Sequence, residues 1–163
     1  MKLLVFFLFF STVLHAQNII RVNAVLVPNT GSFVATSEKA RGRLLKRGED
    51  FTADRISVFA DSFRTDNGLR DKHFAEYIGG GPKLPHSRID ITELKGTKGT
   101  AKANITINGI TKPVDITYTA HDKYVDAKFE VLCSSFNLPK AQYLGIGVED
   151  KVKVSVQYYF EKK

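Results

Sequence analysis

Apolar and polar residues alternate along most of the chain. Strict alternation is clearest in four segments, residues 101–107, 114–120, 125–133 and 152–160. In the third of these, Val125, Ala127 and Phe129 alternate with Asp126 and Lys128. A period of two places successive side chains on opposite faces of a β-strand. Each segment therefore predicts an antiparallel strand with one buried and one solvated face.

The first half of the chain predicts three further strands and one helix. The strands are expected at residues 20–27, 32–45 and 51–63. In the last of these the apolar positions change parity at Ile56 and Val58, which indicates either a β-bulge or a strand buried on both faces. The helix is expected at residues 67–78, because its apolar residues recur at helical spacing. Asp66 is the expected N-cap, and Gly79-Gly80-Gly81-Pro82 is the expected stop signal.

Short turn signals separate the predicted strands. Asn108-Gly109 is the dipeptide most typical of a two-residue hairpin, and residues 95–99 and His121-Asp122 mark two further turns. Strands that follow one another without intervening helices favour an antiparallel meander over a parallel α/β sheet. We therefore predict an all-β fold, an extended antiparallel barrel of about eight strands, seven of which are clear in the pattern, that closes on itself with one short helix inserted after the third strand.

The first sixteen residues have the pattern of a secretory signal peptide. Lys2 supplies the positive start, residues 3–14 are almost wholly apolar, and cleavage is expected after Ala16. The apolar run is shorter than the roughly 20 residues that span a bilayer. An uncleaved anchor or a buried first strand fits the charge and length less well. We expect residues 17–163 to form one domain that is secreted or located in the periplasm.

The basic balance of the chain does not by itself indicate a partner. The formal net charge of +7 would favour anionic partners such as phospholipid head groups. The densest basic cluster comprises Arg41, Arg43, Lys46 and Arg47, and acidic residues flank it. A solvated strand end explains this cluster better than a dedicated anion site, which stays open as the alternative. The other lysines alternate onto the polar faces of strands, so we do not expect nucleic acid as a partner.

Candidate chemistry is sparse. The single cysteine, Cys133, continues the apolar face of its strand, which predicts a buried structural thiol and no intramolecular disulfide. The sequence contains neither a zinc-binding spacing of Cys and His nor a phosphate-binding glycine loop, so no metal and no cofactor motif is expected.

Arg70, Asp71 and His73 form the one set that could suggest acid–base catalysis. No nucleophile lies near them in the sequence, and on a helix residue 71 faces away from residues 70 and 73. We therefore expect structural roles. Asp71 would accept backbone hydrogen bonds near the helix start, while Arg70 and His73 would fix the helix across a barrel mouth or contact a ligand head group.

Three motifs resemble those of the YceI-like family. The first is a strand-to-helix signature over residues 61–74, carried by Thr65, Arg70, Asp71, His73 and Phe74. The second is the hairpin of residues 105–116, with its Gly-x-Thr-Lys-Pro-Val core. The third is Phe136-Asn137-Leu138, followed by residues 147–152. The motifs occur in the family's order and span nearly the whole chain beyond residue 16.

The chain departs from the family pattern at two points. Asn137 stands where the family often has glycine, and Leu84-Pro85 stands where it usually has Tyr-Pro. Asparagine tolerates the left-handed conformation better than most residues, so we expect the turn at residue 137 to survive.

The resemblance implies a lipocalin-like barrel, usually periplasmic, with an apolar interior that holds a polyisoprenoid chain, such as a quinone, or a fatty amphiphile. A long apolar chain can bind without a charged anchor, because each buried CH₂ group contributes about 0.8 kcal/mol. For any single aromatic residue, plain core packing is an equally good explanation. The residues that we expect to line the interior are Phe33, Phe59, Phe63, Phe74, Tyr77, Ile105, Ile107, Ile116, Tyr118, Phe129 and Phe136.

We therefore expect a lipid-binding protein without enzymatic activity, whose partner is an isoprenoid or a fatty amphiphile. Transient membrane contact and a homodimer are further expectations. Two alternatives stay open. A barrel packed solid would indicate a stress-related or structural protein that binds a protein partner through its outer surface, and a hydrolase would use Asp71 and His73.

Overall fold

The structure of the chain is a computed structural model that describes residues 17–79 and 87–161. The predicted signal peptide and the segment Gly80–Pro85 lie outside the described residues. No helix among the residues described is both long and apolar enough to span a membrane.

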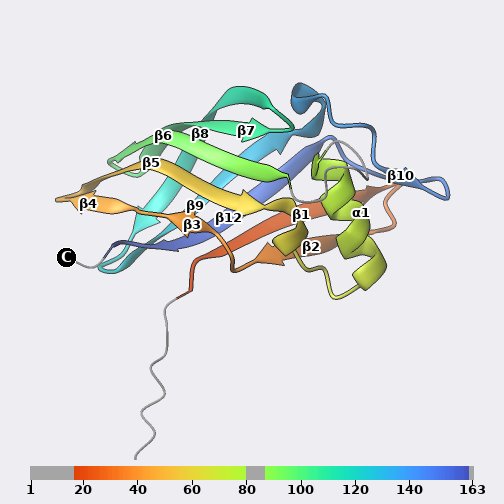
Figure 1. The fold of residues 1–163 in the computed structure, drawn as a ribbon, viewed down its shortest axis with the longest axis horizontal. Coiled ribbons are helices and arrows are strands. Elements are labelled where there is room, and N and C mark those ends of the chain that lie inside the picture. Colours follow the sequence, from red (N-terminus) through yellow and green to blue (C-terminus); the bar gives the residue numbers. More distant parts are fainter. Residues whose placement is uncertain (1–16, 80–86, 162–163) are drawn as a thin grey trace, which may run out of the picture.

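Eight long strands form the framework of the described part (Figure 1). They are β1 (Ile19–Val27), β2 (Gly31–Ser37), β5 (Asp50–Phe59), β6 (Arg88–Thr97), β7 (Thr100–Ile107), β8 (Ile110–Ala120), β9 (Tyr124–Leu132) and β12 (Lys151–Tyr159). Four shorter strands of two or three residues complete it: β3 (Arg41–Gly42), β4 (Leu45–Arg47), β10 (Gln142–Tyr143) and β11 (Ile146–Val148).

The strands pair antiparallel in one curled sheet, so the prediction of an all-β antiparallel fold with one helix is confirmed. The order is β10-β11-β1-β12-β9-β8-β7-β6-β5-β3, while β2 pairs with β1 and β4 pairs with β5. The prediction of a closed eight-stranded barrel is wrong, because the sheet has twelve strands and no ladder joins β2 to β3 or β5 within the described residues. The predicted strand 32–45 stops at Ser37, and the chain then crosses to the opposite edge of the sheet, where β3 begins.

The two edges approach each other without forming a ladder. Thr36 and Arg64 exchange a pair of backbone hydrogen bonds of 2.8 and 2.9 Å. The Tyr158 hydroxyl donates to the Gly42 carbonyl at 2.9 Å, and the Glu161 N–H donates to the Leu44 carbonyl at 2.8 Å. These few contacts hold the sheet in a barrel-like curl.

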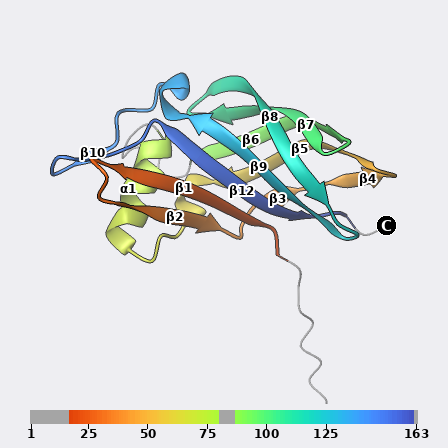
Figure 2. The same cartoon turned by 180° about the vertical axis from the view of Figure 1, so that it is seen from behind.

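The helix forms where the sequence predicts it. A 3₁₀ turn, η1 (Ala60–Ser62), follows β5, so the strand ends before Phe63, and α1 (Gly68–Gly79) follows. The predicted N-cap Asp66 is wrong by one residue. Asp66 is left-handed with φ of 60°, and the Asn67 side chain instead accepts the Arg70 N–H at 3.0 Å. The helix lies at the end of the sheet where β10 lies (Figures 1 and 2).

The change of parity in residues 51–63 corresponds to a bulge in the neighbouring strand. The buried positions of β5 change from Phe51 and Ala53 to Ile56 and Val58. The register between β5 and β6 stays constant, whereas that between β6 and β7 shifts between Thr92 and Lys95. Glu93, inside this shift, is left-handed with φ of 55°. A bulge explains the pattern, but it lies in β6.

Turn chemistry follows the sequence closely. Asn108 and Gly109 have φ of 50° and 73°, as a type I′ hairpin turn requires. The turn predicted at residues 95–99 is shorter than expected, because β6 continues to Thr97. Asn137 has φ of 50°, so it adopts the left-handed conformation expected of it.

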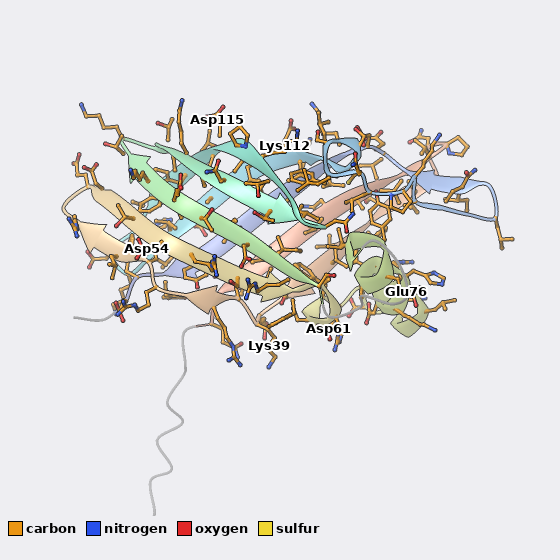
Figure 3. The ribbon with its side chains drawn as sticks, turned by 45° about the horizontal axis from the view of Figure 1, so that its top comes forward. Lys39, Asp54, Asp61, Glu76, Lys112 and Asp115 are labelled. Atoms are coloured by element: carbon orange, nitrogen blue, oxygen red, sulfur yellow. The ribbon has the colours of Figure 1, made fainter. Side chains whose placement is uncertain are left out.

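The inward faces of the strands form one apolar core, and charged side chains cover the outside. Figure 3 shows labelled lysines and carboxylates, such as Lys39, Lys112 and Asp115, projecting away from the ribbon. The basic cluster of residues 41–47 lies on β3, β4 and their link, where Arg41, Arg43 and Arg47 are exposed. This arrangement agrees with a solvated strand end.

Candidate functional site

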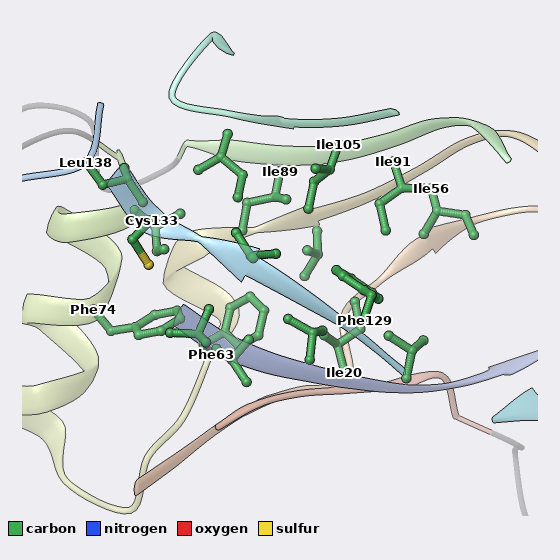
Figure 4. A pocket seen from close by; sticks show the side chains of 18 residues that line it. Ile20, Ile56, Phe63, Phe74, Ile89, Ile91, Ile105, Phe129, Cys133 and Leu138 are labelled. Carbon is green, nitrogen blue, oxygen red and sulfur yellow. The ribbon is translucent and has the colours of Figure 1, made fainter. Parts of the chain in front are cut away.

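The curled sheet encloses an apolar cavity of about 70 Å³ (Figure 4). Six of the long strands, together with α1 and the segments after η1 and β9, contribute its wall. No charged side chain is among its lining residues, which are Ile20, Val22, Ile56, Val58, Phe63, Phe74, Ile78, Ile89, Ile91, Ile105, Ile107, Phe129, Val131, Cys133, Leu138, Val152, Val154 and Val156. A cavity with such a wall stays dry and accommodates apolar groups.

Strand alternation builds the long wall of the cavity. Val154 on β12 lies opposite Val22 on β1 and opposite Phe129 on β9. Each of these residues points inward because its strand presents every second side chain to the core. The wall is therefore a continuous surface of branched and aromatic side chains.

The helix closes one end of the cavity. Phe63, which follows η1, and Phe74 on α1 have ring centroids 5.1 Å apart, and Phe63 is 2% exposed. Figure 4 shows these two rings, with Cys133 and Leu138, at the helix end, while Ile56 and Ile91 lie toward the opposite end.

Five of the residues predicted to line the interior are found in the cavity wall: Phe63, Phe74, Ile105, Ile107 and Phe129. Their contact with a ligand stays a prediction. The sequence reasoning concentrated on aromatic residues and missed most of the aliphatic wall. The alternation that predicted β9 and β12 already contained the signal for Val131, Val152, Val154 and Val156.

Two predicted lining residues lie elsewhere. Phe59 is wrong, because it is 45% exposed at the end of β5, where the positions facing inward are Ile56 and Val58. Phe33 on β2 lies beneath the Arg70 guanidinium, whose carbon is 4.8 Å from the ring centroid. Phe33 lines a separate groove beside α1 instead of the cavity.

Four more predicted residues are buried or half-buried outside the cavity wall. Ile116, Tyr118 and Phe136 belong to the core, and Tyr118 packs edge-on against Phe51 with centroids 4.6 Å apart. Tyr77 on α1 packs against the core beside Cys133.

The thiol in the cavity wall is buried, as predicted. Burial raises the pKa of Cys133, and burial also raises the pKa of its neighbour Tyr77. A thiol with a raised pKa carries little thiolate at neutral pH, so it is a poor nucleophile. Cys133 therefore acts as an apolar wall residue.

Asp71 fastens the start of the helix to the preceding turn. One carboxylate oxygen, Oδ1, accepts both the backbone N–H and the hydroxyl of Thr65, each at 2.7 Å. The other oxygen lies 4.0 Å from Arg64 Nε. The expected structural role of Asp71 is therefore visible, including the backbone hydrogen bond.

Arg70 and His73 lie on a second groove, of about 320 Å³, at the outer face of α1. It is lined by Leu26, Phe33, Asn67, Leu69, Arg70, His73 and Ile146. Its wall combines the Arg70 guanidinium with apolar side chains, and contact of Arg70 or His73 with a ligand head group stays a prediction. Asp71 is engaged by Thr65 instead, so the structure does not bring the predicted set together as one acid–base site. Among the residues that the structure describes, no cluster of His, Cys, Asp and Glu could hold a metal.

Comparisons with known proteins identify similar domains. Residues 16–160 match the family described as the YceI-like domain. No curated protein matches the chain significantly in sequence. Among solved structures, BcnA of Burkholderia cenocepacia is 13% identical with a TM-score of 0.63, over 87% of this chain and 96% of that one.

Two further solved structures have the same fold. A polyisoprenoid binding domain from Saccharophagus degradans, implicated in plant cell wall breakdown, is 8% identical with a TM-score of 0.57, over 89% of this chain and 94% of that one. A mutant of a protein called CJ YCEI is 15% identical with a TM-score of 0.56, over 78% of this chain and 83% of that one. At these identities the likeness establishes the fold.

Proposed function

Because the chain belongs to the YceI-like domain family, we propose that it binds a long apolar lipid, an isoprenoid or a fatty amphiphile, inside its curled sheet. The observation that carries the proposal is the cavity of Figure 4, whose lining residues include no charged side chain. The description of the Saccharophagus degradans domain as polyisoprenoid binding supports the same ligand class.

The physical basis of binding is the removal of apolar surface from water. Each CH₂ group that leaves water contributes about 0.8 kcal/mol, so several isoprene units supply useful affinity without an ionic anchor. No buried charge has to be desolvated in this cavity. The polar end of such a ligand would stay near the surface, where Arg70 and His73 line the groove beside α1.

The size of the cavity sets a condition on this function. Its volume of about 70 Å³ is well below the roughly 300–1,000 Å³ of pockets that hold drug-sized ligands. A long chain can therefore enter only if the wall moves outward. The open edge between β2 and β3 makes such movement easier than in a barrel closed by a continuous ladder.

The protein acts in this proposal as a carrier without enzymatic activity. The leader-like residues 1–16 would direct it out of the cytoplasm, to the periplasm or the medium. Collection or delivery of a lipid would bring it into transient contact with a membrane.

The test uses the mature protein, residues 17–163, with geranylgeraniol, a long-chain ubiquinone and oleamide as probes. A ligand present at 100 times its Kd stabilises the folded state by about 2.7 kcal/mol, which raises Tm by roughly 5–10 °C for a domain of this size. Native mass spectrometry should detect one bound probe per chain, which organic solvent removes. Unchanged Tm values and bare protein masses with all three probes would overturn the proposal.

The small cavity favours one second candidate. A sheet whose interior is largely filled could work through its outer surface, as a stress-related or structural protein that binds a protein partner. That function predicts no stabilisation by any lipid probe.

A further inference from the structure

Strand β8 changes partner along its length. Residues 110–117 of β8 pair with β7, whereas its ladder with β9 contains only four residue pairs, from Thr117–Lys128 to Ala120–Val125. Strand β9, by contrast, pairs with β12 along nine residues. Figure 2 shows β8 and β9 diverging from the turn that they share.

The divergence leaves a gap in the hydrogen-bonded wall, which we call the β8–β9 seam. It lies between Pro113–Ile116 of β8 and Phe129–Leu132 of β9. If the register of the four pairs continued, Val114 would face Val131 and Pro113 would face Leu132. These four residues instead line a groove of about 440 Å³ at the surface.

The sequence of the two strands explains why their ladder stops. Pro113 has no N–H to donate, so it cannot complete a ladder with β9. The continued register would also place Asp115 directly opposite Glu130, and like charges at opposed positions destabilise a strand pair. Lys151 Nζ, 3.1 Å from the Glu130 carboxylate, offsets only part of this repulsion. The Asp115 and Glu130 side chains both line a second, larger groove beside the seam, which has a volume of about 860 Å³.

The apolar cavity lies directly behind the seam. Ile105 and Val131 line both the cavity and the smaller groove. Phe129 and Val154 line both the cavity and the larger groove. The cavity and the two grooves therefore share wall residues at the seam, where no β8–β9 ladder lies between them.

We propose that the β8–β9 seam is the entry site through which an apolar chain reaches the interior. This inference rests on the proposed lipid-binding function. Movement of β7 and β8 away from β9, together with β6, which pairs with β7, opens the seam without breaking a hydrogen bond of the β7–β8 or β8–β9 ladder. The opening between β2 and β3 is less suitable, because backbone hydrogen bonds join Thr36 to Arg64 beside β2, and the Tyr158 hydroxyl donates to the Gly42 carbonyl on β3.

A disulfide across the seam tests the proposal. In a Cys133→Ala background, the pair Val114→Cys and Val131→Cys places two thiols on opposite sides of the smaller groove. Uptake of cis-parinaric acid, a fluorescent long-chain polyene, is followed by stopped flow before and after reduction with dithiothreitol. We expect the oxidised protein to take up the probe at least about tenfold more slowly, equivalent to about 1.4 kcal/mol in the activation free energy.

The matched control is Thr119→Cys with Asp126→Cys, a directly opposed pair in the existing β8–β9 ladder and outside the seam. Its oxidised and reduced forms should take up the probe at the same rate. Equal rates for the two forms of the seam variant, or equal slowing in the control, would overturn the entry site while lipid binding stands. If the wild-type protein takes up no probe, the lipid-binding proposal fails and the entry site fails with it.

A second variant tests the seam without a covalent bond. Pro113→Thr restores a backbone N–H, and Asp115→Lys replaces the repulsion by Glu130 with attraction. Together they should allow β8 and β9 to pair further and slow both uptake and release of the probe. Wild-type rates in a variant with increased amide protection of β8 would contradict the proposal.

Discussion

Two buried tyrosines differ in the environment of their hydroxyl groups. Within the described part of the chain, the Tyr118 hydroxyl is buried without a hydrogen-bond partner. The Tyr158 hydroxyl donates to the Gly42 carbonyl at 2.9 Å. An unsatisfied buried polar group costs about 1–3 kcal/mol, whereas a satisfied hydrogen bond contributes about 0.5–1.5 kcal/mol. We therefore expect Tyr118→Phe to raise the free energy of unfolding by about 1 kcal/mol and Tyr158→Phe to lower it by about the same amount.

Urea unfolding followed by circular dichroism measures both changes, and each variant serves as the control for the other. Loss of stability in Tyr118→Phe equal to that in Tyr158→Phe would show that the Tyr118 hydroxyl has a stabilising partner.

Burial of the Tyr158 side chain also predicts sensitivity to alkaline pH. Burial raises the pKa of Tyr158 to about 12, while an unfolded tyrosine ionises near pH 10. Above about pH 10 the unfolded state therefore holds fewer protons than the folded state, so the free energy of unfolding falls as the pH rises. This contribution is fully present below pH 10 and is lost between about pH 10 and 12.

Melting temperatures measured from pH 8 to 12 should fall less steeply for Tyr158→Phe than for the wild type, since the variant lacks this group. The same slope in both proteins would show that other groups control the alkaline transition.

At the scale of elements, Asp71 connects the helix to the turn before it. Thr65 is 7% exposed, and Asp71 accepts both its N–H and its hydroxyl. Hydrogen bonds to a charged group contribute about 1.5–3 kcal/mol, and their loss leaves two buried donors without a partner. We expect Asp71→Ala to lower the free energy of unfolding by about 2–3 kcal/mol, measured by urea unfolding.

The control for this variant is Lys72→Ala on the same turn of the helix. Lys72 is exposed, and its Nζ lies 3.9 Å from Glu76 Oε1 one helical turn later. An ion pair at this spacing on a helix surface contributes a few tenths of a kcal/mol. Equal small effects of the two substitutions would mean that Asp71 does not fasten the helix.

The elements differ in how well local sequence predicts them. Residues 67–78 predict α1 to within a residue, because spacing and stop signals act within one turn of helix. The short strands β3, β4, β10 and β11 have only two or three residues, so periodicity cannot detect them. The change of parity in β5 coincides with the register shift between β6 and β7 beside Glu93, which the local sequence of β5 does not contain.

At the scale of the whole molecule, the cavity is the feature on which the function depends. Val154 lies in its wall and is 7% exposed, so Val154→Phe directs a larger side chain into the cavity. Filling the void offsets part of the cost of overpacking, and we expect stability within about 1 kcal/mol of the wild type. Affinity for geranylgeraniol should fall at least about tenfold, as measured by native mass spectrometry titration.

Val34→Phe is the matched substitution away from the cavity, because Val34 is 42% exposed on β2. It should leave binding unchanged. Full affinity in Val154→Phe would place the ligand outside the cavity.

Features that depend on near neighbours in the chain can be predicted from the sequence alone. Alternation predicts the long strands, Asn108-Gly109 predicts a tight hairpin, and Asn137 predicts a left-handed turn. The resemblance to the YceI-like family also followed from motifs along the chain. Each of these results depends on backbone preferences or on patterns within about a dozen residues.

How the strands meet and what they enclose depends on tertiary contacts that local patterns do not contain. Phe59 and Tyr118 are aromatic residues of the kind expected to line an apolar interior. Phe59 is nevertheless exposed, and Tyr118 is buried in the core outside the cavity wall. The roles of Pro113 and Asp115 follow only from the end of the β8–β9 ladder at Thr117, beyond which a continued register would place them opposite Leu132 and Glu130. Closure, cavity volume and the seam depend on contacts between residues distant in sequence, which a period of two does not specify.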